Sequence, residues 1–134
     1  MKNYCGKGCY GMAEFLQTWK HEEKTRFPDL MDELANRITT VHPDCTVILF
    51  GSYARGEANE DSDLDICILV SELTQRRIDM NAELRGLIGG ICYDYDMPFD
   101  IKLYTYNEFE QESRYQSSLQ YTIKTEGVTL SGRR

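Results

Sequence analysis

Apolar residues near the start of the chain recur with a helical period. From Met12 to about Thr25 they stand three and four positions apart, and a second pattern of the same kind follows Pro28. That second pattern runs through Leu30, Leu34 and Ile38. We therefore expect the chain to begin with two helical segments, the second of which opens at Pro28.

Three later runs have the pattern of strands. The run Cys45–Phe50 is short, apolar and β-branched, as is Asp63–Val70 after its first residues, and Phe99–Thr105 alternates between apolar and polar positions. Gly51 and Ser52 directly follow the first run, which predicts a tight turn there, and a short helical turn is expected over Tyr53–Gly56. These runs predict a buried sheet.

Helical segments are expected between and after the strands. The stretch Ser71–Leu87 is predicted to be a helix with Ser71 as its N-cap, ended by Gly89 and Gly90. Residues 107–125 are predicted to be helical, and a short apolar ValThrLeu segment at 128–130 precedes a frayed end. Helices that alternate with strands predict an α/β fold.

Length and composition agree with one soluble domain. The chain has 134 residues, of which 41% are hydrophobic and 28% charged, and it contains no apolar run of the length that a bilayer span needs. We expect a cytoplasmic protein. Its five cysteines are odd in number, and Cys45 and Cys67 fall in or beside apolar runs, so a disulfide framework is not expected.

The formal net charge of −7 bears on the ligand. Nucleic-acid binding over an extended surface needs clustered Lys and Arg, and an acidic chain does not favour it. A single nucleoside triphosphate is a different case, because a few backbone N–H groups, one or two basic side chains and metal ions can hold it.

Charge stands where a buried strand would be expected to carry apolar side chains. Asp63 and Asp65 are two apart, so they project from the same face of the second strand, roughly 6.5 to 7 Å apart along the backbone. Asp100 lies on the polar face of the third strand, whereas Leu64, Ile66, Ile68 and Val70 are predicted to face the core. If the third strand pairs with the second, three carboxylates meet on one patch.

Such a patch repels itself unless cations neutralise it. Mg²⁺ accepts carboxylate oxygens together with substrate phosphates, and two such ions can hold the attacking and leaving oxygens of a phosphoryl displacement. A seat for the remaining phosphates is predicted at Gly51 and Ser52, where a glycine turn leads into a helix N-terminus. Arg55 and Lys102 are the candidate charge partners of the phosphates.

The arrangement of these residues resembles a known signature. Gly51-Ser52, Ala54-Arg55-Gly56 and Ser62-Asp63-x-Asp65 before an apolar strand, with the later Asp100, resemble the DNA polymerase β-like nucleotidyltransferase superfamily. The resemblance is greatest to its minimal nucleotidyltransferase (MNT) branch. It implies a nucleotidyltransferase fold with a small mixed β-sheet flanked by helices. It also implies one domain over residues 1–134, with a core at 30–130 and a helical extension at 1–29.

The resemblance further implies roles for the individual residues. Gly51 and Ser52 would bind the nucleotide's phosphates, and Arg55 and Ser62 match further positions of the motif. Lys102 is a nucleotide-binding candidate from its position beside Asp100 rather than from the resemblance. The metal ligands and catalytic carboxylates would be Asp63, Asp65 and Asp100, and two Mg²⁺ ions are expected.

The same resemblance suggests a reaction and its acceptor. Transfer of AMP from ATP, or of another nucleoside monophosphate from its triphosphate, would go to a hydroxyl group. MNT domains of this size are commonly antitoxins of HEPN/MNT toxin–antitoxin pairs, which implies a tyrosine of a HEPN-type partner as acceptor. Two alternatives stay open: an aminoglycoside- or lincosamide-type antibiotic as acceptor, and an antitoxin-like binding module without catalysis. The sequence also leaves open whether the chain forms a homo-oligomer.

Overall fold

A computed structural model describes the backbone of residues 21–131 and the side chains of residues 27–130. The first predicted helix lies largely outside these residues, as do Cys5 and Cys9. No helix in this part of the chain is both long and apolar enough to cross a membrane.

Four strands form one mixed sheet in the spatial order β3-β2-β1-β4. They are β1 (Thr46–Phe50), β2 (Leu64–Val70), β3 (Phe99–Thr105) and β4 (Val128–Ser131). β1 pairs antiparallel with both β2 and β4, whereas β2 and β3 are parallel. The predicted α+β architecture with a small mixed sheet is therefore confirmed, and a fourth, unpredicted strand comes from the ValThrLeu segment.

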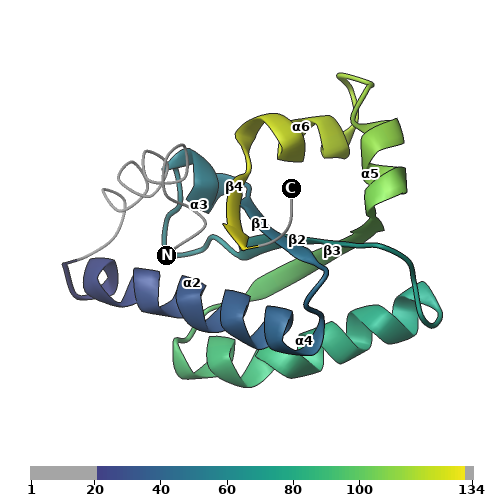
Figure 1. Ribbon diagram of the computed structural model, residues 1–134. Coiled ribbons are helices and arrows are strands. Elements are labelled where there is room, and N and C mark those ends of the chain that lie inside the picture. The colour runs from purple at the N-terminus through teal and green to yellow at the C-terminus, as the bar shows by residue number, and fades with distance from the viewer. Residues whose placement is uncertain (1–20, 132–134) are drawn as a thin grey trace.

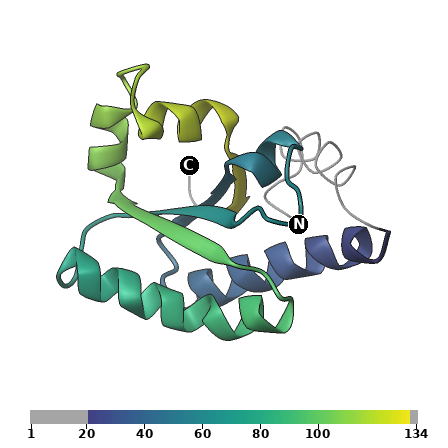
Figure 2. The same ribbon diagram turned by 180° about the vertical axis from the view of Figure 1, so that it is seen from behind.

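Helices cover both faces of the sheet (Figures 1 and 2). α2 (His21–Val41) and α4 (Arg77–Asp94) lie below it in Figure 1, whereas α5 (Tyr106–Glu112) and α6 (Leu119–Glu126) lie above it. The short α3 (Ser52–Arg55) follows β1 directly. The long parallel connection from β2 to β3 is made by α4, as parallel pairing requires.

The larger core lies between the sheet and the α2/α4 layer. Leu64, Ile66, Ile68 and Val70 of β2 all belong to it, as their alternation predicts. α2 and α4 each contribute a stripe of fully or almost fully buried side chains: Leu30, Met31, Leu34 and Ile38 from α2, and Met80, Leu84, Ile88 and Ile91 from α4. A second, smaller cluster on the other face contains Ile48, Phe50, Cys67, Leu69, Phe109 and Ile123.

Three of the predicted helix boundaries are wrong. α2 runs through Pro28 without a break, because its apolar stripe begins at Phe27 and continues on the same side, and one lost hydrogen bond does not outweigh that burial. α4 begins at Arg77 rather than Ser71, and Ser71 does not cap it. It also passes through Gly89 and Gly90, because Ile91 and Cys92 continue the buried stripe beyond them.

The predicted helical region at 107–125 is two helices rather than one. α5 begins in a capping box, in which the Glu108 amide donates to Thr105 Oγ1 at 3.1 Å and the Thr105 amide donates to Glu108 Oε1 at 2.9 Å. α6 begins after Ser118, whose Oγ accepts from the Tyr121 amide at 3.0 Å. Ser118 Oγ also donates to the Glu112 carbonyl at 2.8 Å, which ties the end of α5 to the start of α6.

The cysteines in the described residues are free thiols, namely Cys45, Cys67 and Cys92. Burial raises the pKa of Cys67 to about 12. It raises the pKa of Cys45 and of Cys92 to about 11. Protonated, buried thiols of this kind behave as small apolar side chains.

Candidate active site

The acidic and glycine residues of the motif lie at one end of the sheet, in adjacent strands. Phe50, the last residue of β1, is opposite Asp65 in β2, and Asp65 is in turn opposite Asp100 in β3. Gly51 follows Phe50, and Asp63 directly precedes β2. The pairing of β3 with β2 thus brings Asp65 and Asp100 side by side, as required for a shared patch.

Both aspartates stand on the face that carries the smaller core cluster. Cys67 and Leu69 follow Asp65 at alternate positions and belong to that cluster, and Tyr104 packs against it from the Asp100 face of β3. Further along the strands this face is filled with apolar side chains. At the start of β2 and β3 the same face carries the carboxylates of Asp65 and Asp100. Charge therefore interrupts the apolar pattern of β2 only at the end of the sheet where these strands begin.

Asp65 lies in an environment that disfavours its charged form. Burial raises its pKa, and the neighbouring carboxylates of Asp100 and Asp63 raise it further, while the charges of Lys102 and Arg55 oppose the shift. Among the described residues neither Asp63 nor Asp65 forms an ion pair with a basic side chain. A partly buried carboxylate without a salt-bridge partner, beside two others, is an environment that a cation would relieve.

Gly51 is shaped to the carboxylate of Asp65. Its φ of 81° and ψ of −156° lie in a region that is essentially restricted to glycine. A Cβ atom at this position would collide with Asp65 Oδ2. The turn after β1 therefore depends on glycine twice, for its backbone and for the space that the Asp65 side chain occupies.

The loop between α3 and β2 is held by its own polar groups. Ser62 Oγ accepts a hydrogen bond from the Asn59 amide at 2.9 Å, and Asn59 Oδ1 accepts one from the Asp61 amide at 2.8 Å. Ser62, predicted to bind nucleotide, thus has a structural contact in this loop. The loop delivers the chain to Asp63 and the start of β2.

The two predicted basic residues have carboxylate partners. Arg55 Nε lies 2.9 Å from Glu57 Oε1, and its Nη1 lies 3.4 Å from Glu126 Oε1 at the end of α6. Lys102 Nζ lies 3.4 Å from Asp100 Oδ2, on the same face of β3. Both basic side chains are about half exposed, so their ion pairs can exchange for phosphate oxygens.

Sequence reasoning missed Arg85. This residue of α4 reaches the edge of the sheet, where its Nη2 lies 2.8 Å from Asp100 Oδ1. Asp100 is thus bound on one oxygen by Arg85 and on the other by Lys102. Four-residue spacing from Arg77 and Asn81 is the signal that places Arg85 on one face of α4 with them, but only the fold brings that face to β3.

The chemistry of the donor set fits a hard divalent cation. Asp63 and Asp65 offer carboxylate oxygens of the kind that Mg²⁺ prefers, and the Asp65 carboxylate packs against the Gly51 turn. Within residues 27–130 no three acidic, histidine or cysteine side chains are gathered closely enough to hold a metal ion. Both oxygens of Asp100 are engaged by basic side chains, one by Arg85 and the other by Lys102.

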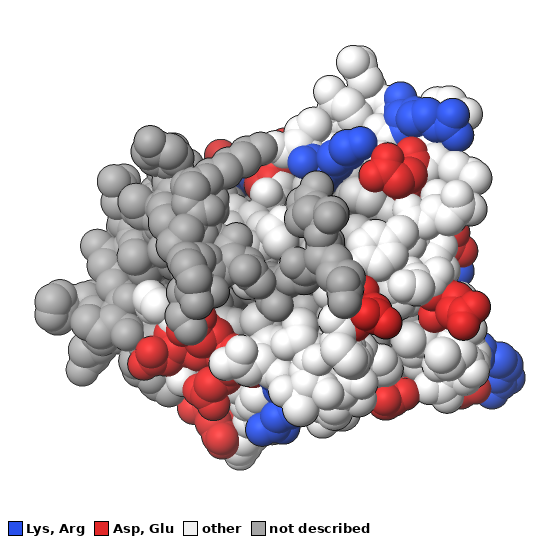
Figure 3. Space-filling view, in the orientation of Figure 1, with Lys and Arg blue, Asp and Glu red and all other residues white. Residues whose placement is uncertain are grey.

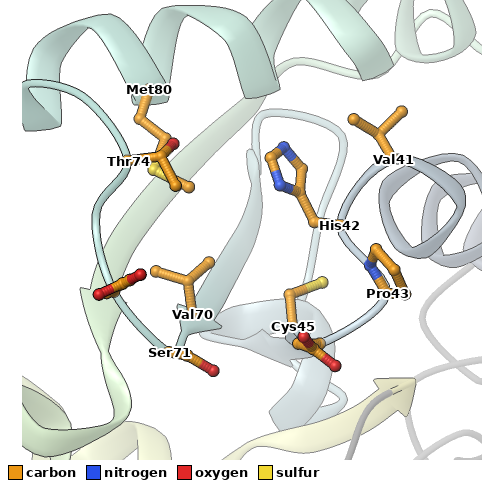
Figure 4. Close-up of a pocket in the computed structure, with 10 residues that line it drawn as sticks. Val41, His42, Pro43, Cys45, Val70, Ser71, Thr74 and Met80 are labelled. Atoms are coloured by element: carbon orange, nitrogen blue, oxygen red, sulfur yellow. The ribbon is translucent and has the colours of Figure 1, made fainter.

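A separate hollow lies at the opposite end of the sheet (Figure 4). It has a volume of about 230 Å³, and its lining includes His42, Cys45 and Val70, close to the start of β1 and the end of β2. His42 Nε2 lies 3.3 Å from Glu83 Oε2 of α4. The hollow lies at the opposite ends of β1 and β2 from Asp63, Asp65 and Asp100, and none of these three aspartates lines it.

Surface charge on the described part of the face in Figure 3 is mixed. Acidic side chains are spread over the lower half, where α2 and α4 lie, with single Lys or Arg side chains among them, and further Lys and Arg side chains stand beside an acidic one near α5 and α6. They form no continuous basic band on that part of the face. This distribution accords with the net charge of −7.

A mixed sheet with a glycine turn after its first strand and aspartates on the next two is the core of a nucleotidyltransferase fold. The nucleotidyltransferase domain family matches residues 31–125, and the chain belongs to this family. The match covers every site residue named above.

Two curated proteins of Methanocaldococcus jannaschii are similar to the chain. "Putative protein adenylyltransferase MJ1305" is 38% identical over 69 residues, which are 50% of this chain and 47% of that protein. "Putative protein adenylyltransferase MJ0141" is 47% identical over 47 residues, which are 34% of this chain and 48% of that protein. The chain therefore aligns with about half the length of each relative.

A solved structure shares the fold. It is described as a crystal structure of a toxin–antitoxin with AMP-PNP, and it superposes with a TM-score of 0.53 at 20% identity, over 78% of this chain and 74% of the other. The likeness supports the architecture derived above: a small mixed sheet with helices on both faces.

Proposed function

We propose that the protein is a Mg²⁺-dependent nucleotidyltransferase that moves AMP from ATP to a hydroxyl group of a partner protein. The observation that carries the proposal is that Asp65 and Asp100 lie side by side in adjacent strands, with Gly51 in the turn directly after Phe50, the β1 partner of Asp65. The names of the two archaeal relatives support a protein acceptor and an adenylyl group. The solved toxin–antitoxin structure with AMP-PNP supports an adenine nucleotide.

Each residue of the site has a task in this reaction. Gly51 lets a phosphate approach the backbone, and Ser52 offers its amide and hydroxyl beside it. Lys102 and Arg55 exchange their carboxylate partners for phosphate oxygens. Asp63, Asp65 and Asp100 are the residues that would hold Mg²⁺, which when bound supplies charge neutralisation at the α-phosphate and the leaving oxygens.

The bond changes balance as follows. The acceptor oxygen forms a bond to the α-phosphorus, the bond from that phosphorus to the bridging oxygen of the β-phosphate breaks, and pyrophosphate leaves. The hydroxyl proton is accepted by Asp100 or passes to water. Catalysis by this chain is positioning and electrostatic stabilisation, since no residue needs to form a covalent intermediate.

The acceptor that we propose is a tyrosine of a HEPN-type toxin, with this chain as the antitoxin. The support is the resemblance to MNT antitoxins, together with the toxin–antitoxin description of the solved structure with the same fold. The gene next to that of this chain is the first place to seek the partner.

The test is transfer of α-labelled ATP to the protein encoded by the neighbouring gene, in the presence of Mg²⁺. We expect label on the partner with the wild-type chain and loss of about 100-fold or more in rate with Asp65→Asn, because an amide binds a hard cation poorly. Asp61→Asn is the matched control, since it removes an acidic charge from the exposed loop before the site and is expected to keep the rate.

Two results would contradict the proposal. Near-normal transfer by a folded Asp65→Asn variant would show that the reaction does not need the Asp65 carboxylate. A stable complex with the partner that carries no label would identify the chain as a binding module without catalysis. That second candidate has one observation in its favour, namely that both oxygens of Asp100 are already paired.

A further inference from the structure

α4 lies along the free edge of β3 and binds it through side chains. Arg77 Nη1 donates to the Leu103 carbonyl at 2.8 Å, and Asn81 Nδ2 donates to the Ile101 carbonyl at 3.3 Å. β3 pairs with β2 on one side only, so these carbonyls face outward from the sheet. Arg85 is the next member of this row, four residues after Asn81.

Arg85 differs from the other two because it binds a side chain of the site. Its Nε donates to Asn81 Oδ1 at 3.0 Å, and its guanidinium lies over the Phe99 ring at 5.5 Å from the centroid. These two contacts fix the plane of the guanidinium, which leaves Nη2 directed at Asp100 Oδ1, 2.8 Å away. The contact is therefore built by its surroundings rather than made by a loose surface side chain.

The other oxygen of Asp100, Oδ2, lies 3.4 Å from Lys102 Nζ, so both oxygens of this carboxylate are paired with basic side chains. Asp65 stands opposite Asp100 in the strand register and has no ion pair among the described residues. Among the described residues the site thus contains two carboxylates without an ion pair, Asp63 and Asp65, and one, Asp100, that is paired on both oxygens. The side chains of Arg85 and Asp100 are 44% and 39% exposed, which makes their ion pair exchangeable.

We propose that Arg85 is a positioning residue that holds Asp100 in an exchangeable ion pair, which a divalent cation at Asp65 must displace before Asp100 can become its ligand. The inference rests on the proposed function, because it takes Asp65 and Asp100 as metal ligands. It adds that Arg85 of α4, which lies outside the sequence motif, competes with the metal ion for the Asp100 carboxylate.

The experiment is a Mn²⁺ titration of the nucleotide-free, full-length protein at about 0.15 M ionic strength, with free Mn²⁺ followed by electron paramagnetic resonance. Arg85→Gln is expected to lower the Kd for Mn²⁺ about two- to fivefold, because an exposed ion pair that competes with the cation is removed. Addition of Mn²⁺ is also expected to raise the melting temperature of Arg85→Gln by more than that of the wild type.

Arg76→Gln is the matched control. Arg76 lies just before α4, is 80% exposed and pairs with Asp79, so its removal costs the same charge far from the site. We expect it to leave the Kd for Mn²⁺ unchanged, since at that ionic strength the lost positive charge is screened over the distance to the site. In an Asp100→Asn background, Arg85→Gln is expected to have no effect on the Kd, because the ion pair is already absent.

An unchanged or higher Kd in Arg85→Gln would overturn the inference, and a higher one would make Arg85 a support of the bound cation instead. The failure of the underlying site has a different signature. If wild-type Mn²⁺ binding is absent or survives Asp65→Asn, both the metal site of the proposed function and the inference fall. If Asp65→Asn abolishes binding and Arg85→Gln does not tighten it, only the inference about Arg85 falls.

Discussion

At the scale of single residues, the site depends on one glycine and one carboxylate that share the same space. Gly51 ends β1 in a backbone conformation that side chains strongly disfavour, and the carboxylate of Asp65 occupies the position where a Cβ would lie. Asp65 lies opposite Phe50 of β1 on one side and opposite Asp100 of β3 on the other. The raised pKa of Asp65 follows from this placement.

Gly51→Ala is expected to damage transfer more than stability. The positive φ costs the folded state about 1–3 kcal/mol, whereas the Asp65 side chain can swing away from the new methyl group. A displaced carboxylate lowers the transfer rate by about 100-fold. Urea unfolding and the labelled-ATP assay measure the two effects, and an alanine variant with wild-type transfer would contradict the role of this turn.

At the scale of elements, the same residue type acts in opposite ways in different places. Gly90 lies inside α4, where an added Cβ would meet nothing within 4 Å, so it only weakens the helix. Gly127 joins α6 to β4, where an added Cβ would lie 2.5 Å from the Ile123 carbonyl oxygen and 2.5 Å from Ile48 Cγ2. The first glycine is dispensable, and the second lets β4 reach the sheet.

Alanine substitution separates these two glycines. Gly90→Ala is expected to raise the free energy of unfolding by about 0.5–1 kcal/mol, because alanine is the better helix former and the site is open. Gly127→Ala is expected to lower it, since backbone and core atoms would have to move. Chemical denaturation measures both changes, and a destabilised Gly90→Ala would show that α4 needs that glycine.

At the scale of the whole molecule, the strands that build the site were predictable and the helices around them were less so. Short apolar runs locate β1, β2 and β3 to within a residue, and their alternation assigns the core face correctly. The row Gly51, Asp65 and Asp100 then follows from strand pairing. β4 was missed because three apolar residues do not distinguish a strand from a frayed end.

The errors at the proline and glycine positions within helices have a common cause. Pro28, Gly89 and Gly90 are local signals for a break, and in each case a buried stripe that continues past them overrides the signal. The contact of Arg85 with Asp100 spans 15 positions and depends on how α4 passes the sheet edge, which no local pattern contains. Packing between distant segments therefore decides what the sequence motif leaves open.

Stability of the metal-free protein should depend on pH through Asp65. The ordinary pKa of an aspartate is 3.8, and in the folded protein the pKa of Asp65 is raised above that value. The folded protein therefore binds more protons than the unfolded chain in the range above 3.8. Below pH 3.8 Asp65 is protonated in both states, and the folded protein keeps its full stability with respect to this group. That stability is lost as the pH rises through the folded-state pKa of Asp65, because the folded protein must then hold an ionised carboxylate. An ionised Asp65 consequently opposes folding at neutral pH.

Asp65→Asn removes this unfavourable charge. In the presence of a chelator we expect the variant to gain stability relative to wild type at pH 7, and this gain should shrink as the pH falls toward 3.8. Urea denaturation of both proteins between pH 3.5 and 7.5 measures the difference. A difference of opposite sign, or one that does not change with pH, would contradict the described environment of Asp65.

The row of Arg77, Asn81 and Arg85 has a consequence for how the protein meets other chains. A bare edge strand invites an incoming β-strand, whether from a partner or from another copy during aggregation. On β3 the Leu103 and Ile101 carbonyls are already occupied by α4 side chains. Strand addition is thus closed off at these two positions of β3, and the protein acceptor that we propose would have to be bound away from this edge of the sheet.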